Sequence, residues 1–579
     1  MDANGLAHRA PWYTHTAMSE RDTLRYVLAA SAWIVLALVH PGSDPAQAQL
    51  AAALTGQVTS AEEGPMEGVL VSAKKAGSTI TTTVVTDAQG RYRFPGPRLT
   101  PGPYALSIRA VGYELEGARA ADVGANGPVT ADLRLRKTQN LGAQLTNAEW
   151  LASMPGNEDQ KKVLLGCVQC HTLERTVRSA YDAAGFAQVQ QRMGTYVNQS
   201  TPLHIQARRA ERLLEMRGEE RQRARQALAE FLSGVNLNGR ATWPYELKTL
   251  PRPSGRGTRV VITEYDLPRP TIQPHDVIVD RDGVAWFCNF GEQTLGKLDP
   301  RTGRVTEYRV PELKPGFPTG ALSVRFDRDH NLWLGLMFQG GIAKFDRKTE
   351  RFSTWSLPPE VNRDMTQVNM TSPHSSHVDG KVWTNNNGFA AVHRLDLASG
   401  KFETWEPFRE GVAKGRNHNI YDVIADSKNN AYFTDFSNEH IGRVDAKTGV
   451  VTLFTIPTPR SAPRRAQMDA QDRLWFAEYR GNKIGMFDTA TERFTEWTAP
   501  RPWAQPYDVT LDRNGEAWTG SMLNDRILRL DPATGVFTEY LLPRSTNVRR
   551  VFVDSSTTPV TFWVGSNHGA SIVKLEPLD

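Results

Sequence analysis

The chain has 579 residues, about twice what a single hydrophobic core usually supports, so several domains are expected. Its 68 Lys and Arg nearly balance its 63 Asp and Glu, which leaves a formal net charge of only +5. A charge this small over so long a chain argues against a protein that binds nucleic acid through a concentrated basic patch.

Residues 1–48 have the pattern of an export signal. Arg21 and Arg25 precede an apolar run over 26–39, and the small-x-small cleavage pattern falls at 46–48. The run is shorter than the ~20 residues that a bilayer-spanning helix needs. We therefore expect cleavage near residue 49 and a periplasmic or secreted mature protein that does not span a membrane. An uncleaved membrane anchor is the alternative.

Residues 49–137 are predicted to form a small β domain. Short apolar runs, such as 54–58 and 68–73, alternate with Gly- and Pro-containing turns, which is typical of a β-sandwich. The segment Thr86-Asp87-Ala88-x-Gly90-x-Tyr92-x-Phe94, with Gly56-x-Val58 and Gly68-Val69-x-Val71 before it, resembles the carboxypeptidase regulatory-like family. The resemblance implies an Ig-like or prealbumin-like sandwich that serves as a spacer or adhesive module, with carbohydrate binding proposed for some members.

A c-type haem attachment motif, Cys167-Val168-Gln169-Cys170-His171, lies within residues 138–240. In such a motif the two thiols form thioether bonds with the haem vinyl groups, and the imidazole is an axial ligand of the iron. Half of a zinc site or a redox Cys-x-x-Cys is the alternative reading. A zinc site needs more Cys or His ligands nearby, and the third cysteine, Cys288, is far away in the sequence. We therefore predict covalently bound haem c.

The patterns around this motif predict helices. One is expected over 147–154 and one over 158–165, and an Arg- and Glu-rich helix is expected over 205–232. Between the motif and the last helix, Phe186, Val189 and Met193 recur at helical spacing. This order resembles a class I cytochrome c domain, which is a small all-α fold.

In that family the distal haem ligand is a methionine in the loop before the last helix. The resemblance makes Met193 the candidate, because Gly194 and Thr195 end its predicted helix. The alternatives are His204 first, then Met216 and Met154. An open sixth position is a further alternative and would indicate ligand binding rather than simple electron transfer. Residues 241–258, rich in Pro, Gly and Arg, are expected to form a linker.

Residues 259–579 repeat with a period of ~40–45 residues, which is typical of a β-propeller. The aromatic residue of the second strand occurs seven times: Trp286, Trp333, Trp383, Tyr432, Trp475, Trp518 and Trp563. The outer-strand signature also occurs seven times, but its first copy, at Thr263, precedes the first inner strands. Residues 260–266 are therefore predicted to complete the last of seven four-stranded blades and to leave no open edge.

The propeller sequence resembles the virginiamycin B lyase (streptogramin lyase) family through Trp475-Phe476-Ala477-Glu478, Asn482-Lys483-Ile484-Gly485 and Asp531-Pro532-Ala533-Thr534-Gly535. In that lyase a Glu-x-His and the Glu of a following Trp-Phe-x-Glu hold magnesium and supply the base. Glu478 matches the second element. The first reads Ala462-Pro463-Arg464, so the base and one carboxylate are absent. His275 lies at the equivalent place in blade one, with Gln273 and Asn289 as poor magnesium ligands.

Loops that enter the inner strands and loops that follow the Trp strands are expected on one face of the propeller. Functional side chains concentrate on such loops, so we predict a polar pocket there. The histidines assigned to these loops are His275, His374, His377, His418, His440 and His568. The other polar residues assigned to this face are Asn289, Asn385, Asn386, Asn417, Asn419, Tyr421, Asp435, Arg464, Glu478, Tyr507 and Arg549.

His275, His418 and Glu478 are the candidate catalytic residues of this pocket. His374 and His377 are the closest histidine pair in sequence for a metal. Magnesium or another metal there would be an addition to the haem iron. Cys288 is interpreted as a lone buried thiol.

These observations predict a periplasmic c-type haem protein. Its cytochrome domain would exchange electrons with a periplasmic redox partner, while the propeller binds a small molecule or a glycan. Whether it is a haem-dependent oxidoreductase stays open. The alternatives are a carbon–oxygen lyase on the propeller and a non-catalytic protein that binds glycans or surfaces. A short gap between the haem and the polar face would favour oxidation chemistry at the channel.

Overall fold

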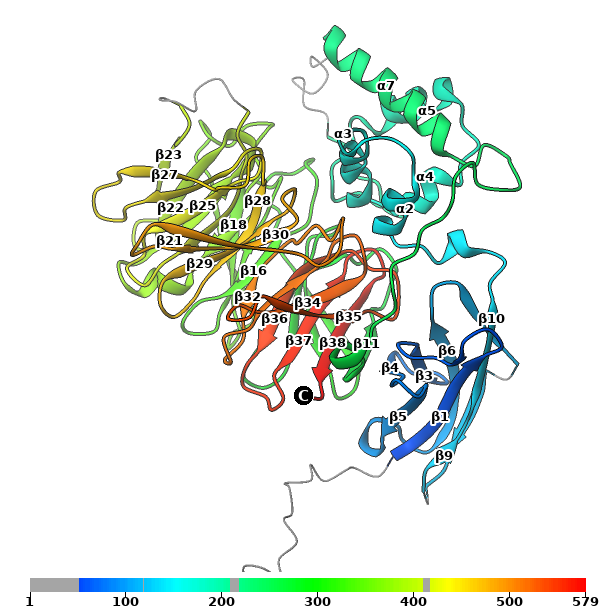
Figure 1. The fold of residues 1–579 in the computed structure, drawn as a ribbon. Helices are drawn as coiled ribbons and strands as arrows, with labels where there is room; N and C mark the ends of the chain where they lie inside the picture. The colour runs from blue at the N-terminus through cyan, green and yellow to red at the C-terminus, as the bar shows by residue number, and fades with distance from the viewer. Residues whose placement is uncertain (1–51, 118, 126, 209–217, 410–416) are drawn as a thin grey trace, which may run out of the picture. The chain divides into compact units, whose positions relative to one another are not determined.

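The computed structural model describes residues 52–117, 119–125, 127–208, 218–409 and 417–579. The predicted export signal, 1–48, and Met216 lie outside these residues. Residues 52–579 form one compact unit that is mainly β (Figure 1). Within the described residues, no helix is long and apolar enough to cross a membrane.

The first part of the unit is an Ig-like β-sandwich, which confirms the predicted fold of this segment. One sheet has the order β2-β1-β10-β7, with β5 and β9 also paired to β1, and the other contains β4-β3-β6-β8. Alternate side chains of both sheets, including Leu54, Val71, Phe94 and Leu135, form its apolar core. The elements are β1 (Ala52–Ser60), β2 (Gly64–Pro65), β3 (Leu70–Lys75), β4 (Ile80–Val85), β5 (Arg91–Pro95), η1 (Gly96–Arg98), β6 (Gly102–Arg109), β7 (Tyr113–Glu116), β8 (Ala120–Val123), β9 (Val129–Thr130) and β10 (Leu133–Lys137).

Helices follow the sandwich. They are short, and two begin with a reciprocal capping box, at Thr146 with Glu149 and at Asn157 with Gln160. The elements are η2 (Leu141–Ala143), α2 (Asn147–Ser153), α3 (Glu158–Lys162), η3 (Val163–Gln169), α4 (Leu173–Val177), α5 (Ala183–Met193) and α7 (Glu219–Val235). The attachment motif begins in the last turn of η3.

The helix predicted over 205–232 is wrong in its first part. The described helix begins at Glu219, and residues 205–208 belong to a non-helical segment, 195–208, that we call the strap. The strap folds back on itself through Val197 N to Gln206 O (3.0 Å) and Arg208 N to Thr195 O (2.8 Å). The Gln206 side chain also donates to the propeller carbonyls of Gly291 and Thr319. These tertiary contacts override a favourable helix propensity.

Six four-stranded antiparallel sheets follow in chain order, and a seventh joins β36-β37-β38 to β11. The strands are β12 (Pro274–Val279), β13 (Ala285–Asn289), β14 (Thr294–Asp299), β15 (Arg304–Arg309), β16 (Ser323–Phe326), β17 (Leu332–Gly335), β18 (Gly341–Asp346), β19 (Arg351–Ser356), β20 (Thr371–Ser372), β21 (Lys381–Asn386), β22 (Ala391–Asp396), β23 (Phe402–Trp405), β24 (Ile420–Ala425), β25 (Ala431–Asp435), β26 (His440–Val444), β27 (Val451–Thr455), β28 (Pro463–Met468), β29 (Arg473–Glu478), β30 (Lys483–Asp488), β31 (Arg493–Thr498), β32 (Thr510–Leu511), β33 (Ala517–Gly520), β34 (Arg526–Asp531), β35 (Val536–Leu541), β36 (Val548–Asp554), β37 (Thr561–Ser566) and β38 (Ser571–Pro577), with η5 (His374–His377) and η6 (Asn387–Phe389) in the third sheet.

The repeated tryptophan has a structural task. In four blades its indole N–H donates to an Asp six residues earlier, and the same carboxylate accepts backbone N–H groups of the tight turn between the first two strands. The pairs are Trp286 with Asp280, Trp333 with Asp327, Trp475 with Asp469 and Trp518 with Asp512, at 2.8–3.0 Å. In these blades the indole ring packs in the core and its N–H group fixes the turn. The tryptophan repeat seen in the sequence is therefore explained by folding rather than by function.

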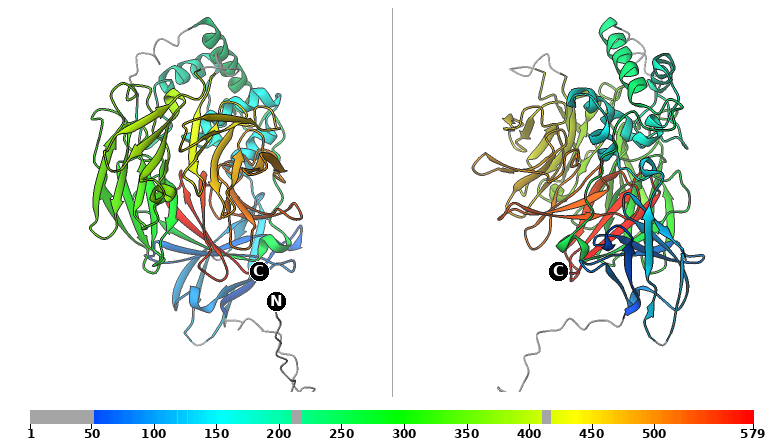
Figure 2. Two further views of the ribbon diagram at one scale, coloured as in Figure 1. Left: turned by 90° about the vertical axis from the view of Figure 1, so that its left-hand side faces the viewer. Right: turned by 45° about the vertical axis from the view of Figure 1, so that its right-hand side comes forward.

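Strand β11 (Val260–Asp266) completes the seventh sheet, as the repeat predicted. It pairs antiparallel with β38 over its whole length, with Ile262 opposite Leu575. Its other edge is covered by the sandwich, because β4 pairs with it antiparallel and places Thr83 opposite Ile262. The result is one continuous sheet, β36-β37-β38-β11-β4-β3-β6-β8. In both views of Figure 2 the blue sandwich strands accordingly lie beside the red last blade.

The continuous sheet joins the sandwich directly to the propeller, and the role of the sandwich as a spacer or adhesive module stays a prediction. The segment 241–258, predicted as a linker and containing η4 (Gly255–Thr258), is also packed. Lys248 N donates to Ser153 Oγ and Leu250 N to Glu149 Oε1, both in the helical segment. Arg252 forms an ion pair with Glu63 of the sandwich. The sandwich is therefore held by the continuous sheet and by the packed segment 241–258.

The propeller channel is filled by a ring of buried charges that we call the charge ring. It contains three aspartates and three arginines from six blades, so its formal charges balance: Asp276, Arg325, Asp422, Arg465, Asp508 and Arg550. Arg325 binds both oxygens of Asp422 at 3.0 Å. Asp276 receives Arg465 on one oxygen and Arg550, at 3.0 Å, on the other. Paired in this way, the charges connect blades that are distant in the sequence.

Replacing Asp276 by Asn should destabilise the protein by about 3–5 kcal/mol, because Arg465 and Arg550 would stay buried without their counter-charge. The measurement is the free energy of unfolding from denaturant titration. Asp282→Asn is the matched control, since its side chain is 77% exposed in the same blade. A loss no greater than that of the control would contradict the structural role of the charge ring.

Candidate functional site

The attachment motif has an apolar, half-buried setting. Cys167 and Cys170 are both free, and Cys167 packs against a cluster that includes Trp150, Met154 and Leu164. Burial raises the pKa of Cys167 to about 11. Burial also raises the pKa of Cys170, against an opposing effect of the nearby Arg549 charge. Both sulfurs are therefore neutral thiols at neutral pH.

His171 is oriented by its own chain. Its Nδ1–H donates to the Thr172 carbonyl at 2.9 Å, so the lone pair of the neutral ring is on Nε2. Burial is the main cause that lowers the pKa of His171, which favours this neutral form. No hydrogen bond to Nε2 is made by any residue that the structure describes. A hydrogen bond of this kind from Nδ1 is the usual way in which a protein fixes a metal-ligating imidazole.

The motif backbone lies directly on the propeller. Asn547 Nδ2 donates to the Val168 carbonyl at 3.1 Å. Arg549 Nη2 and His568 Nε2 approach the Gln169 carbonyl at 2.9 Å and 3.1 Å. Asn547 directly precedes the inner strand of the last blade, β36, Arg549 lies at its beginning, and His568 follows β37. The sequence predicted a polar pocket on this face. No intervening layer of chain therefore separates the motif from that face.

The channel contains a second layer of polar side chains, which we call the upper layer. Each of its residues comes one position before a residue of the charge ring in the sequence. It consists of His275, Tyr421, Arg464, Tyr507 and Arg549, all buried. Four of these residues, all but Tyr507, occur where the register between the first two strands of the blade shifts. A β-bulge allows two consecutive side chains to point into the channel, and such bulges are frequent beside active sites.

Hydrogen bonds connect the upper layer into a chain. His275 Nε2 lies 3.0 Å from the Tyr507 hydroxyl. The hydroxyls of Tyr507 and Tyr421 are hydrogen-bonded to each other. Arg464 Nη2 donates to the Tyr421 hydroxyl at 3.3 Å. A chain of this kind can orient a ligand group or transfer a proton along its hydroxyls.

The Arg464 guanidinium is enclosed by aromatic rings. Its central carbon lies 3.9–4.9 Å from the ring centres of Tyr421, Phe436, Tyr479 and Tyr507. Arg549 lies over Phe290 and Tyr507 at longer distances of 5.4 Å and 5.8 Å. Cation–π contacts partly replace the hydration that a buried guanidinium loses.

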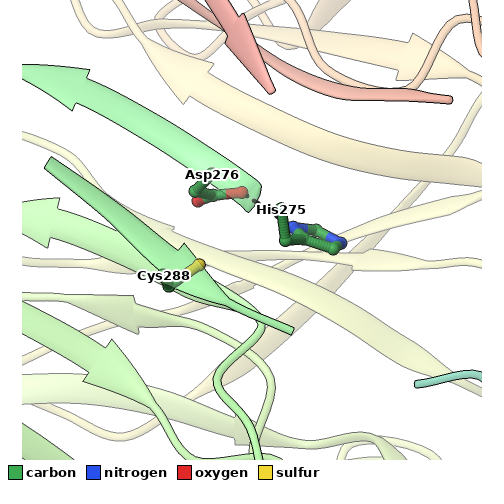
Figure 3. A group of neighbouring side chains, drawn as sticks. All are labelled: His275, Asp276 and Cys288. Atoms are coloured by element: carbon green, nitrogen blue, oxygen red, sulfur yellow. Dashed lines mark hydrogen bonds and ion pairs between the residues drawn. The ribbon is translucent and has the colours of Figure 1, made fainter. Parts of the chain in front are cut away.

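His275 is the one predicted catalytic residue that the structure brings into the upper layer. Together with Asp276 and Cys288 it forms a buried group of potential metal ligands (Figure 3). Asp276 is already bound by His275, Arg465 and Arg550, so a cation there would meet two guanidinium charges. We interpret the group as structural. Cys288 is the buried thiol that the sequence predicted, and burial raises its pKa well above the usual value.

His418 belongs to a separate cluster. Its ring stacks on Phe408 with centroids 3.8 Å apart, and its Nδ1 lies 2.7 Å from Asp435 Oδ2. The same oxygen of Asp435 is 3.4 Å from His440 Nδ1. The hydrogen-bond chain of the upper layer does not include this pair of histidines.

Glu478 lacks the partners that the lyase pattern requires. It is buried, and in the metal-free protein its pKa is raised to about 9 by that burial and by the neighbouring Glu496. Ala462 stands where the pattern has its first carboxylate. Arg464 occupies the position at which the lyase pattern has its histidine. The residues present therefore do not form the magnesium site of that pattern.

The assignment of His374 and His377 to the polar face is wrong. Both lie in η5, between β20 and β21, which is the connection at the opposite end of the blade. Ser375 of the same turn donates to the Asp426 carbonyl in the equivalent turn of the next blade. The error arises because β20 has only two residues, so the sequence pattern misplaces the inner strand by one connection.

The distal-ligand candidates are placed as follows. Met193 is half-buried at the end of α5, which stops at the predicted Gly194. Met154 is buried in the apolar cluster that contacts Cys167. His204 lies in the strap, where its backbone N–H donates to the Thr201 carbonyl at 3.1 Å. Met193 as the sixth ligand stays a prediction.

The sequence patterns did not indicate four residues of this site: Phe290, Phe436, Tyr479 and Asn547. A signal for the upper layer was available, because a dyad of polar residues recurs at the head of five inner strands: His275-Asp276, Tyr421-Asp422, Arg464-Arg465, Tyr507-Asp508 and Arg549-Arg550. The first member of each dyad enters the upper layer and the second enters the charge ring.

The fold and the site define a seven-sheet propeller that is covered by a helical segment and extended by an Ig-like sandwich. Comparison with family models agrees with two of these parts. Residues 406–577 match the virginiamycin B lyase family, and residues 53–136 match the carboxypeptidase regulatory-like domain.

Among solved structures, virginiamycin B lyase from Staphylococcus aureus is 24% identical, with a TM-score of 0.46, over 55% of this chain and 99% of its own. A streptogramin B lyase is 23% identical, with a TM-score of 0.47, over 56% of this chain and 99% of its own. A curated relative, lactonase drp35 of Staphylococcus haemolyticus, is 33% identical over 115 residues, which are 19% of this chain. The match spans 31% of that relative's length.

His275 should make the protein less stable in acid. Burial lowers its pKa from 6.5 to about 3, so the unfolded chain binds a proton in this range that the folded chain excludes. The contribution of His275 to the free energy of unfolding is complete above pH 6.5. It falls by about 1.4 kcal/mol per pH unit as the pH drops toward 3.

The measurement is the free energy of unfolding between pH 7 and pH 4 for the wild type and for His275→Gln, which cannot take up this proton. The variant should show a flatter dependence over this range. His377→Gln, at an exposed position, is the control and should follow the wild type. Parallel curves for the wild type and His275→Gln would contradict the assignment of a neutral buried imidazole.

Proposed function

We propose that this is an exported c-type haem protein in which the haem lies next to a ligand pocket on the propeller. Cys167 and Cys170 would hold the haem through thioether bonds, and His171 would ligate its iron through Nε2. The bound iron would supply one-electron transfer with a periplasmic redox partner. The pocket is the upper layer, and its ligand is a small molecule.

The chemistry of the residues fits a haem. The two cysteines are neutral thiols on an apolar cluster, which is a suitable setting for the apolar edge of a porphyrin. The Thr172 carbonyl holds the imidazole so that Nε2 is the free nitrogen. Within the described residues these two cysteines have no disulfide, and no third cysteine lies beside them to complete a zinc site.

The observation that carries the proposal is the contact between the motif and the propeller. Asn547, Arg549 and His568 hold the carbonyls of Val168 and Gln169, which lie between the two cysteines. Arg549 is at the same time part of the upper layer. One side chain thus connects the attachment motif to the pocket, which favours a shared task over two separate ones.

A magnesium-dependent lyase is not favoured, because Ala462 replaces the first carboxylate of the lyase pattern and Arg464 replaces its histidine. A role of the sandwich in adhesion or glycan binding finds no support in its β4 edge, since that edge is paired with β11. Electron transfer coupled to the propeller pocket is therefore the function that we propose.

Loss of either motif thiol should remove covalent haem. In protein exported with its haem-attachment machinery, Cys167→Ser and Cys170→Ser should each reduce covalent attachment by tenfold or more, because each removes one thioether bond. The measurement is the pyridine haemochrome spectrum together with haem staining after denaturing electrophoresis.

Cys288→Ala is the matched control, because this thiol is buried in blade one and away from the motif. It should retain full haem content. Wild-type protein that carries no haem, with Cys167 and Cys170 recovered as free thiols, would end the proposal.

Met193→Ala should lower the reduction potential of the haem and abolish the weak far-red absorption band of a methionine–iron bond, because a thioether ligand favours the reduced iron. Met154→Ala is the comparison, since this methionine packs in the cluster beside Cys167. If the band is lost in Met154→Ala and kept in Met193→Ala, Met154 is the ligand. A wild type that never shows the band has another sixth ligand.

A further inference from the structure

We infer that the upper layer is an anion site, and that Arg464 and Arg549 together bind the carboxylate of its ligand. This inference rests on the proposed function in taking the upper layer as the ligand pocket, and it names the chemical class of that ligand.

The first argument is the balance of charge. In the charge ring, three arginines face three aspartates, and each arginine contacts at least one of them. In the upper layer, the side chains of Arg464 and Arg549 are as buried as the arginines of the charge ring, at 2% and 1% exposure. Neither forms an ion pair with any acidic side chain that the structure describes. A buried cation without a counter-charge is costly, so an anion from outside the described protein groups would stabilise both.

The second argument is the balance of donors and acceptors. Arg464 Nε is buried, and no described residue accepts a hydrogen bond from it. Arg464 Nη1 contacts only the Met522 thioether, at 3.5 Å, and thioether sulfur is a weak acceptor. These N–H groups of Arg464 can only donate, which selects a ligand group that accepts.

The third argument is shape. A guanidinium presents parallel N–H groups that match the two oxygens of a carboxylate. The rings of Phe290, Tyr421 and Tyr507 line the same layer and suit a flat apolar body attached to that carboxylate. Phosphate sites usually add backbone N–H groups of a glycine-rich turn or a helix N-terminus, and the upper layer is built from side chains.

Two sources can supply this carboxylate. A haem attached at the motif carries two propionates, and Arg549 already contacts the Gln169 carbonyl between the two attachment cysteines. A free aromatic or aliphatic acid is the other source. Both sources present a carboxylate to the two arginines, and a comparison of haem-free with haem-loaded protein distinguishes them.

The test uses the full-length protein, both haem-free and haem-loaded, with sodium benzoate as the probe and benzamide as its neutral counterpart. Isothermal titration calorimetry measures the binding. Haem-free wild type should bind benzoate at least tenfold more tightly than benzamide. Arg464→Gln and Arg549→Gln should each weaken benzoate binding by tenfold or more, while Arg464→Lys, which keeps the charge, should retain part of it. Arg480→Gln, at an exposed position near the same face, is the matched control and should bind as the wild type does.

If the propionates are the source, haem loading should abolish benzoate binding, and Arg549→Gln should shift the reduction potential. If a free acid is the source, the haem-loaded protein should bind benzoate as the haem-free protein does. The inference is overturned if benzoate binds no better than benzamide, if inorganic phosphate binds more tightly, or if both glutamine variants, folded by circular dichroism, bind as the wild type does. Failure of haem attachment leaves this test intact, so the two proposals can fail separately.

Discussion

The charge ring is the constraint on which the rest of the structure depends. Three aspartates and three arginines from six blades neutralise one another inside the channel, where no bulk water can do so. Asp276 alone connects blade one to blades five and seven. Because these pairs fix the heads of the inner strands, the residues one position earlier are held in a defined layer. The position of the upper layer is therefore a consequence of how the propeller closes.

The upper layer differs from the charge ring in one respect that matters for function. Its two arginines are enclosed by aromatic rings instead of carboxylates. The helical segment covers this layer with the backbone of its attachment motif, and Arg549 contacts both. The proposed cofactor attachment and the proposed ligand binding therefore share the side chain of Arg549.

Local patterns in the sequence predicted much of the fold and part of the candidate site. The tryptophan repeat and the displaced outer-strand signature predicted seven blades and their closure through 260–266, since each depends on neighbouring residues. The face of His374 and His377 was missed because β20 is too short to show its alternation. The last residues of the strap, 205–208, were predicted as helix because the contacts of Gln206 with Gly291 and Thr319 are tertiary. Nothing local marks the environment of Glu478, whose burial decides its protonation.

The continuous sheet through β11 has a consequence for the outer surface of the propeller. Strand β11 is the outermost strand of the seventh blade, and one of its edges pairs with β38. Its other edge would be open if the propeller stood alone, and β4 pairs with it. An unpaired strand edge can pair with a second chain, so the sandwich removes one edge at which two copies could associate.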